Sequence, residues 1–281
     1  MKGVFNEVCL VTGASTGLGR EIAKLLAEKG YKVYVTARQK DYLLGLKKEC
    51  KDFKGEIILA ELGDLSELDF RKKLILKILK KEGKIDYLIN NAGYGRAIKF
   101  HLQESEEIHK MFEVNMVAYA HLARLILPNM LKNNKGRIIN IGSVVAFTPL
   151  PYFTIYNSTK AAIYSFNRSL RYELRDSNVS STVVLPARMK TKFAEKAYDC
   201  YIENGQRICV QRFNKGAGDP LIVARNVLRN INNSKEVITP TFKSKVWYFM
   251  RYFGFIVDFV MKNILGPKEK MHLEAAEHKT N

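Results

Sequence analysis

Short apolar runs alternate with longer amphipathic stretches along most of this 281-residue chain, and this alternation restricts the fold more than any other feature. The apolar runs have the length and β-branched content of buried strands. Strands that alternate with helices form parallel sheets with helices packed on both faces. We therefore predict an α/β fold, Rossmann-like and doubly wound, with a seven-stranded parallel sheet in a single domain.

The predicted strands lie at 8–11, 33–36, 57–62, 87–89, 138–141, 182–185 and 237–238. The predicted helices lie at 19–29, 39–50, 66–82, 104–131, 156–176 and 220–231. Asp219 before Pro220 supports the start of the last of these helices, because aspartate is a good N-cap and proline fits the first helical turn.

A glycine-rich loop from Thr12 to Gly19 (TGASTGLG) joins the first predicted strand to the first predicted helix. Its glycines at 13, 17 and 19 let the backbone turn sharply and approach a pyrophosphate, which the start of a helix attracts. The strand before the loop and the helix after it favour a dinucleotide site. The loop resembles the TGxxxGxG motif of the short-chain dehydrogenase/reductase family.

The end of the second predicted strand indicates which dinucleotide binds. Folds that select NAD usually carry Asp or Glu there, for the ribose 2′-hydroxyl, but this chain has Ala37 and then Arg38. Arginine has a permanent charge and a planar fork that suits a phosphate, and Ser15 could add a hydroxyl. We therefore predict NADP(H) as the cofactor.

Tyr156 and Lys160 lie four residues apart in a predicted helix, so their side chains share one face. A lysine ammonium beside a phenol favours the phenolate, so we expect the pKa of Tyr156 to fall toward neutral pH. Such a tyrosine can exchange a proton with a substrate oxygen. Ser143 lies thirteen residues before Tyr156, and Asn115 lies further upstream.

These four residues resemble the Asn–Ser–Tyr–Lys active site of the same family, and the resemblance spans about residues 7–240. It implies that Tyr156 is the general acid in reduction and the base in oxidation, and that Lys160 lowers its pKa and holds the nicotinamide ribose. It also implies that Ser143 donates to the substrate oxygen and that Asn115, on a kinked helix, positions a water beside Lys160.

Further motifs of the family follow in order along the chain. Asp64 resembles the aspartate that meets the adenine, residues 90–93 match its NNAG run, and Thr191 stands where the carboxamide is bound. The family usually has Pro-Gly where this chain has Pro186-Ala187, so the backbone near the nicotinamide is expected to differ slightly. The cofactor-binding residues implied are Gly13, Ser15, Thr16, Gly17, Leu18, Gly19, Arg38, Asp64, Leu65, Asn91, Ala92, Gly93, Tyr156, Lys160, Pro186, Met189 and Thr191.

The substrate is expected to be lipophilic. Mostly apolar residues surround Ser143 and Tyr156 in the sequence, among them Val145, Phe147, Leu150, Tyr152 and Phe153, and an apolar cleft with one polar anchor suits a hydrophobic ketone, aldehyde or alcohol. We predict Ser143, Val145 and Tyr156 as substrate-binding residues. The 147–152 stretch resembles family members that act on steroids and retinoids, which implies a role in lipid metabolism. Alternatives are a carrier-linked 3-ketoacyl reductase and a catalytically idle NADP-binding sensor or scaffold.

The domain organisation predicted is a dinucleotide-binding domain at 1–242 with a substrate lid at about 187–218, a C-terminal aromatic helical segment at 243–266 and a polar tail at 267–281. Two charges inside the short apolar run at 246–261 argue against a membrane-spanning helix. Three interpretations of 246–265 stay open: a wall over the cleft or a subunit contact, a helix lying on lipid, or a core helix.

The net charge of +18 needs a separate explanation. Its lysines are spread along the chain without an aromatic-interleaved basic motif, so we predict solvated helix faces, with weak attraction to acidic lipid as an alternative and no nucleic-acid partner. The four scattered cysteines and the absence of a leader favour a cytoplasmic protein without metal, either free or peripheral at a membrane. The family resemblance implies a homodimer or homotetramer through the helices at 104–131 and 156–176.

Overall fold

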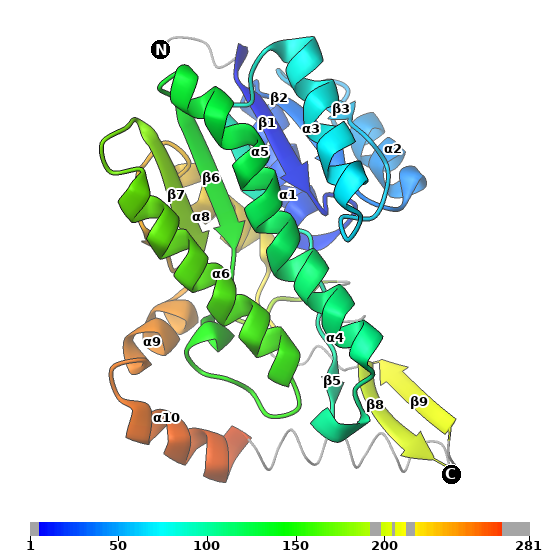
Figure 1. Ribbon diagram of the computed structural model, residues 1–281, viewed down its shortest axis with the longest axis vertical. Helices are drawn as coiled ribbons and strands as arrows, with labels where there is room; N and C mark the ends of the chain where they lie inside the picture. Colours follow the sequence, from blue (N-terminus) through cyan, green and yellow to red (C-terminus); the bar gives the residue numbers. More distant parts are fainter. Residues whose placement is uncertain (1–5, 192–197, 204–205, 212–216, 266–281) are drawn as a thin grey trace.

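Seven parallel strands form the central sheet of the computed structural model, in the order β10-β7-β6-β4-β1-β2-β3 (Figure 1). The structure describes residues 6–191, 198–203, 206–211 and 217–265. Every neighbouring pair in the sheet is parallel, which confirms the predicted doubly wound architecture. The strands are β1 (Val8–Thr12), β2 (Lys32–Thr36), β3 (Glu56–Leu59), β4 (Tyr87–Asn90), β6 (Gly136–Ile141), β7 (Val179–Val184) and β10 (Val237–Ile238).

Helices cover both faces of this sheet, as predicted. One face packs against α1 (Gly17–Glu28), α2 (Lys40–Glu49) and α8 (Pro220–Arg229). The other face packs against α3 (Leu68–Glu82), α5 (Ala118–Lys132) and α6 (Thr154–Glu173). Asp219 caps α8 as the sequence indicates, because its carboxylate accepts the Leu221 N–H at 2.8 Å.

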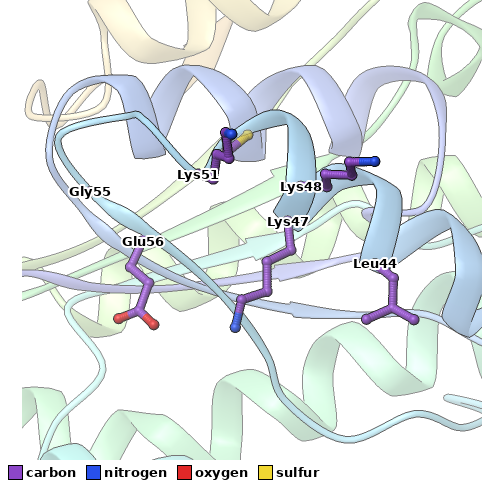
Figure 2. A pocket seen from close by; sticks show the side chains of 7 residues that line it. Leu44, Lys47, Lys48, Lys51, Gly55 and Glu56 are labelled. Carbon is purple, nitrogen blue, oxygen red and sulfur yellow. The ribbon is translucent and has the colours of Figure 1, made fainter.

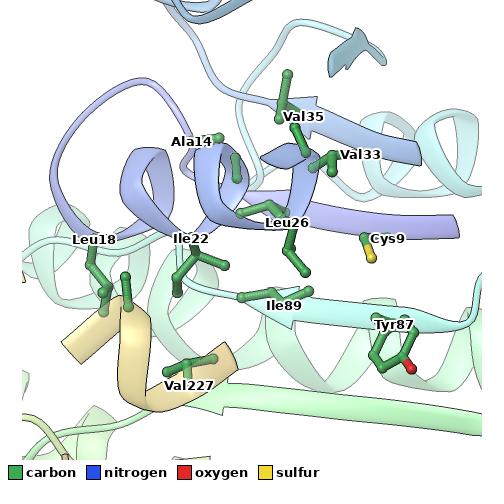
Figure 3. Close-up of a cluster of buried hydrophobic side chains, with 14 of the residues drawn as sticks. Cys9, Ala14, Leu18, Ile22, Leu26, Val33, Val35, Tyr87, Ile89 and Val227 are labelled. Carbon is green, nitrogen blue, oxygen red and sulfur yellow. The ribbon is translucent and has the colours of Figure 1, made fainter. Parts of the chain in front are cut away.

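Alternate residues of each strand supply the two layers of core. Val8 and Leu10 of β1 lie in the cluster beneath α3 and α5, whereas Cys9 and Val11 lie in the cluster beneath α1 and α8. Figure 3 shows the second of these clusters, where Ile22 and Leu26 of α1 lie over the sheet. Both faces are buried, which explains why the strands read as continuous apolar runs rather than as alternating ones.

A π-helical turn interrupts the long helix predicted at 104–131. α4 (Ser105–Phe112) runs into the turn Glu113–Val117, which continues directly into α5. A π turn inserts one extra residue into a helix and is often found at functional sites. Asn115 lies within it, so the kink expected at this asparagine is confirmed.

A second, smaller sheet was not predicted. β5 (Ala97–Ile98) pairs with β8 (Tyr198–Glu203), and β8 forms an antiparallel hairpin with β9 (Gln206–Gln211). The hairpin lies within the predicted lid at 187–218, of which 192–197, 204–205 and 212–216 are outside the described residues. Short 3-10 turns follow β5 at Phe100–Leu102 and β6 at Val144–Ala146.

The C-terminal aromatic segment forms two helices rather than one. α9 (Phe242–Met250) and α10 (Gly254–Val260) are followed by a π turn at Met261–Leu265, and the predicted polar tail at 267–281 lies outside the described residues. Within the part of the chain that the structure describes, no helix is both long and apolar enough to cross a membrane.

Candidate active site

The glycine-rich loop between β1 and α1 packs directly against the segment that follows β4. Gly13 and Gly17 have φ values of 66° and 59°, a left-handed conformation that glycine adopts without strain. A methyl group at Gly13 would also lie 2.7 Å from Cα of Ala92. The loop therefore requires glycine both for its conformation and for its close approach to the NNAG run.

Asn91 of that run holds the glycine loop in place. Its side-chain amide donates to the carbonyls of Thr12 at 3.0 Å and Gly13 at 3.2 Å. In return, the Thr12 hydroxyl accepts the backbone N–H groups of Asn91 and Ala92 at 2.9 and 3.1 Å. Thr12 was not among the predicted site residues, although it opens the TGxxxGxG motif and could have been identified from it.

The start of α1 is suited to an anion. Thr16 is the N-cap residue, its side chain makes no capping bond, and the first turn contains no acidic residue. Backbone N–H groups and the helix dipole there attract negative charge. Ser15 stands just before this turn, and its carbonyl accepts a hydrogen bond from Arg20 at 3.5 Å.

Leu18 and Leu65 are two predicted cofactor contacts whose side chains are members of the hydrophobic core. Leu18 packs beneath α1 and α8, and Leu65 packs on the opposite face of the sheet. Because both side chains are buried in apolar packing, the backbone atoms of these two residues are the parts that can face a dinucleotide.

Arg38 lies beyond the end of β2 with 67% of its side chain exposed, and its Nη1 atom is 3.8 Å from a carboxylate oxygen of Asp64. Asp64 also pairs with Lys110 at 3.4 Å. Burial raises the pKa of Asp64, but the Ser66 N–H and Lys110 outweigh burial and hold that pKa below its usual value. The structure thus brings together the two residues predicted to meet the adenosine part of the cofactor.

The loop after β7 approaches the glycine loop from the other side. A methyl group at Gly17 would lie 3.1 Å from Cβ of Thr191, and the Thr191 side chain is buried. The Pro186 carbonyl accepts the Val144 N–H at 3.2 Å, which ties this loop to the one after β6. Met189 forms an isolated bridge to Gly218. Loss of the usual glycine at Ala187 leaves these connections intact.

The four predicted catalytic residues come from three places at the edge where the carboxyl ends of the strands lie, hereafter the carboxyl edge. Ser143 follows β6, Tyr156 and Lys160 lie in the first turns of α6, and Asn115 lies in the π turn. The Lys160 Nζ atom is 5.6 Å from the centre of the Tyr156 ring and donates to the Ile141 carbonyl at 2.9 Å. Spacing along α6 therefore places both side chains on one face, as predicted.

Asn115 is fully buried and locks the π turn to the loop after NNAG. Its carbonyl oxygen accepts the Tyr94 N–H at 3.0 Å, and its amide donates to the Tyr94 carbonyl at 2.8 Å and to the Thr159 hydroxyl at 3.2 Å. A methyl group at Gly93 would lie 2.9 Å from Oδ1 of Asn115 and 3.9 Å from Nζ of Lys160. Gly93 is therefore the spacer that lets these two side chains share the site.

The prediction of a lowered Tyr156 pKa is wrong. Burial raises this pKa above its ordinary value of 10.0, and the hydrogen bond with Ser143 lowers it by less. Burial also lowers the pKa of Lys160 to about 7, because an ammonium loses hydration in the interior. A buried lysine with so low a pKa is only partly charged at neutral pH and stabilises a phenolate less than a full ammonium would, so Tyr156 stays protonated there in the protein alone.

Tyr119 is a site residue that the sequence reasoning missed. Tyr119 lies on α5 and is fully buried, and its ring centre is 5.7 Å from Lys160 Nζ. Within the described residues its hydroxyl has no hydrogen-bond partner, and burial raises its pKa. Tyr119 lies four residues after Asn115, a spacing that places both side chains on the same helix face. This spacing was the sequence signal from which Tyr119 could have been predicted as a site residue.

The apolar residues expected around the site divide into two groups. Leu150, Tyr152 and Phe153 cluster with Ala97 of β5 beside Tyr156, and the Phe153 and Tyr156 rings meet edge to face with centres 6.1 Å apart. These residues form an apolar wall next to the catalytic tyrosine.

Phe147 belongs to the second group and does not flank the tyrosine. Its ring packs against Tyr164 at 4.5 Å and Tyr248 at 5.6 Å, in the core cluster that contains Val144 and Tyr119. Val145 is buried beside Ser143, whose Oγ atom accepts its N–H at 3.3 Å. Val144 and Val145 are therefore both buried after Ser143, and Phe147 packs away from Tyr156, which the apolar composition alone did not reveal.

A hollow of about 500 Å³ lies elsewhere, between the end of α2 and the start of β3 (Figure 2). Lys47, Lys48, Lys51 and Glu56 line it together with Leu44, Cys50 and Gly55. It adjoins the amino end of β3, whereas the predicted site residues lie at the carboxyl edge. In doubly wound folds ligands bind at the carboxyl ends of the strands, so this hollow is not the candidate site.

The family described as short chain dehydrogenase matches residues 7–201. An uncharacterized oxidoreductase of Staphylococcus saprophyticus is 32% identical over 186 residues, which cover 66% of this chain and 80% of that protein. A hydroxysteroid 11-beta-dehydrogenase 1-like protein of Xenopus tropicalis is 36% identical over 69% of this chain and 68% of its own length. A 3-oxoacyl-acyl-carrier-protein reductase of Thermotoga maritima is 29% identical over 83% of this chain and 93% of its own length.

Solved structures agree with these relatives. A short chain dehydrogenase/reductase from Burkholderia phymatum in complex with NAD has the same fold at 24% identity, with a TM-score of 0.80 over 92% of this chain and 97% of the other. A metagenomic short-chain oxidoreductase in complex with NADP is 27% identical, with a TM-score of 0.68 over 82% of this chain and 92% of the other.

Proposed function

The chain belongs to the short-chain dehydrogenase/reductase family of oxidoreductases, and from this premise we propose that it is an NADP(H)-dependent carbonyl reductase or alcohol dehydrogenase acting on a lipophilic substrate. The observation that carries the proposal is the position of Tyr156 beside Ser143, Lys160 and Asn115 at the carboxyl edge. A protonated tyrosine at that place is equipped to donate a proton to a carbonyl oxygen.

The residues present fit a nicotinamide dinucleotide. The left-handed glycines and the uncapped start of α1 leave backbone N–H groups for the pyrophosphate. The Thr191 side chain, opposite Gly17, leaves a hydroxyl for the nicotinamide end. A bound nicotinamide would supply the hydride, and the protein supplies orientation and electrostatics. Lys160, with Nζ held by the Ile141 carbonyl, is in place to bond the adjoining ribose.

Arg38 supports NADP(H) over NAD. Its guanidinium is largely exposed at the end of β2, and its carboxylate partner among the described residues is Asp64, at 3.8 Å. An ion pair of that length at the surface is weak, so a 2′-phosphate could attract the guanidinium away from it. A solved relative is in complex with NADP, which is consistent with the same choice here.

Tyr156 is proposed as the acid in reduction and the base in oxidation. It is protonated at neutral pH, which is the form that reduction requires, and its raised pKa makes it a weaker acid in the protein alone. Ser143, which is buried and bonded to Tyr156, would donate to the oxygen where negative charge develops. Asn115 holds the π turn beside Lys160, and we propose that a water there connects the lysine to solvent.

A lipophilic substrate is supported by the apolar wall of Leu150, Tyr152 and Phe153 beside Tyr156. The hydroxysteroid dehydrogenase-like relative agrees with this class. A carrier-linked 3-ketoacyl reductase is the second candidate, because a reductase of that kind matches 83% of the chain and a basic surface suits an acidic carrier. An idle NADP-binding sensor is disfavoured, because it would have no need for all four catalytic groups.

The test is NADPH oxidation by the purified protein with medium-chain ketones and aldehydes and, separately, with a 3-oxoacyl group on an acyl-carrier protein. We expect turnover of the free lipophilic carbonyls, with kcat/KM rising as the apolar chain lengthens. Turnover of the carrier-linked substrate alone would select the second candidate. NADPH binding without turnover of any of them would overturn both enzyme assignments.

A further inference from the structure

The outward face of the two C-terminal helices is apolar, the reverse of an ordinary surface helix. Phe242, Val246 and Phe249 recur at helical spacing on α9, and Phe255 and Phe259 do so on α10. The four phenylalanine side chains are 60–81% exposed. We call these five residues the C-terminal aromatic face. Monomeric proteins seldom expose rings so close together without a partner.

Contacts on the inward side of α9 fix this orientation. Ser244 is fully buried, and its hydroxyl accepts the Ala187 N–H at 3.1 Å. Trp247 and Tyr248 pack against the core cluster that contains Tyr119 and Val144. Ser244 therefore points inward and the phenylalanines Phe242 and Phe249 point outward, so the exposed rings cannot turn into the core without breaking these contacts.

Arg251, the cation in the middle of the aromatic run, also points inward. Its guanidinium lies 3.8 Å from the centre of the Tyr248 ring and 4.6 Å from that of Tyr252. It donates to the Tyr164 hydroxyl at 3.1 Å. Stacking on these rings satisfies the charge within the protein, so the arginine does not interrupt the C-terminal aromatic face.

Exposed lysines border the C-terminal aromatic face. Lys243 and Lys245 flank Phe242 and Val246 on α9, and Lys262 follows α10. Asp258 is the one acidic residue in the described 242–264 stretch. Long lysine stems can lie along apolar surface while their ammonium groups reach an aqueous or anionic layer. The arrangement is complementary to a bilayer whose acyl region takes the rings and whose anionic headgroups meet the lysines.

We propose that the C-terminal aromatic face docks the protein on a bilayer that contains anionic lipid. A second copy of the chain fits this face less well, because a two-fold contact would set two surfaces bordered by the same lysines against each other, positive charge against positive charge. The helices α9 and α10 that carry the face lie at the end of the molecule where β6 and β7 point, and α9 lies next to the turn Val144–Ala146 that follows Ser143 (Figure 1). Docking would thus turn the candidate active site toward the lipid.

Flotation of the full chain with vesicles tests the proposal without depending on any activity. We expect binding to vesicles of phosphatidylcholine with phosphatidylserine, and much weaker binding to phosphatidylcholine alone. The double variant Phe249→Ser, Phe255→Ser should lower the partition coefficient by roughly tenfold or more, since each ring loses its apolar burial. Leu76→Ser on α3, whose side chain is 66% exposed, is the matched control and should bind as the wild type does.

A second variant isolates the charge contribution. Lys243→Glu, Lys245→Glu should weaken flotation with the anionic vesicles and leave the weak binding to neutral vesicles unchanged. Thermal melting by circular dichroism verifies that each variant is folded. The proposal is overturned if the wild type floats with neither vesicle, or if the phenylalanine variant floats as the wild type does. It is also overturned if that variant instead converts a dimer to a monomer in light scattering, which would assign the face to a second copy.

Discussion

Lys160 is the residue whose environment most changes the chemistry expected from the sequence. Four-residue spacing correctly placed it on the same helix face as Tyr156, and the family resemblance gave it the task of lowering the tyrosine pKa. Burial decides the outcome instead, because it lowers the pKa of Lys160 to about 7 and raises that of Tyr156. Burial of a side chain depends on every element packed around it, and spacing within one helix does not report it.

The buried lysine should make stability depend on pH. Its pKa is about 7 in the folded chain against an ordinary value of 10.5, so the folded state binds fewer protons than the unfolded state between these two pH values. This group's contribution to stability therefore rises with pH in that window. Lys160→Met should raise the free energy of unfolding by about 1–3 kcal/mol at pH 6, and by less at pH 9. Urea denaturation at the two pH values measures the difference.

Lys80→Met is the control for that experiment, because Lys80 is exposed on α3. It should leave stability nearly unchanged at both pH values. A gain for Lys160→Met that is equal at pH 6 and pH 9 would show that the lysine is charged in the folded chain throughout.

Arg38 gives the second prediction at the scale of the residue. Replacing it with aspartate removes the cation proposed for the 2′-phosphate and adds a carboxylate that can accept from a ribose hydroxyl. Arg38→Asp should lower the ratio of kcat/KM for NADPH over NADH by about tenfold or more. A wild-type enzyme that clearly prefers NADH would contradict the assignment before the variant is made.

At the scale of the element, the parts that bind or react were predicted and the parts that enclose them were not. The glycine loop and the NNAG run each have a local signature, since a turn, a cap or a spacing lies within a few residues. The kink at Asn115 was expected only from the family resemblance, because the sequence pattern predicts one continuous helix at 104–131. The hairpin of β8 and β9 also has a local signature, because Asn204-Gly205 separates two six-residue strand-like runs in the sequence, but the sequence analysis did not use it. The pairing of β8 with the two-residue strand β5, about a hundred positions earlier in the chain, has no local signature.

The docking of α9 also escaped the sequence analysis, which left a cleft wall, a lipid contact and a core helix open. One buried serine now explains the helix's orientation, since Ser244 accepts the Ala187 N–H and α9 is capped by Thr241.

Ser244→Ala should therefore loosen α9. The substitution leaves the Ala187 N–H unpaired in the interior, at a cost of about 1–3 kcal/mol. Native-state hydrogen exchange should show faster exchange for the amides of Phe242–Met250, whereas α1 should be unaffected. Ser158→Ala, at an exposed position of α6, should change neither. Unaltered exchange in α9 would mean that the aromatic contacts alone hold it.

At the scale of the whole molecule, one edge of the sheet collects the chemistry. Parallel strands end there together, so residues far apart in the chain, from the glycine loop to the loop after β7, meet at a single edge. The strand order follows from right-handed crossovers between alternating strands and helices, which is why the seven-stranded sheet could be predicted. The number of chains cannot be derived in this way. Assembly through α5 and α6, which enclose a groove of about 330 Å³ lined by Leu127, Leu131 and Phe166, stays a prediction.

The net charge of +18 acts at this scale as well. A basic surface strengthens attraction to anionic lipid over a distance of about 10 Å at moderate salt, and the lysines beside the C-terminal aromatic face make that attraction local. These lysines lie at the end of the molecule that carries the candidate active site, so docking there would bring the site close to a lipophilic substrate in the bilayer. The docking proposal and the proposed substrate class have separate tests.

The central claim is that Tyr156 transfers the proton in a reaction that uses NADPH, and Tyr156→Phe tests it most directly. With a ketone or aldehyde that the wild type reduces, the variant should lose roughly 10²–10⁴-fold or more in kcat while fluorescence titration shows NADPH binding close to that of the wild type. Tyr172→Phe, on the exposed surface of the same helix, should retain full activity. Wild-type kcat in Tyr156→Phe would contradict the account.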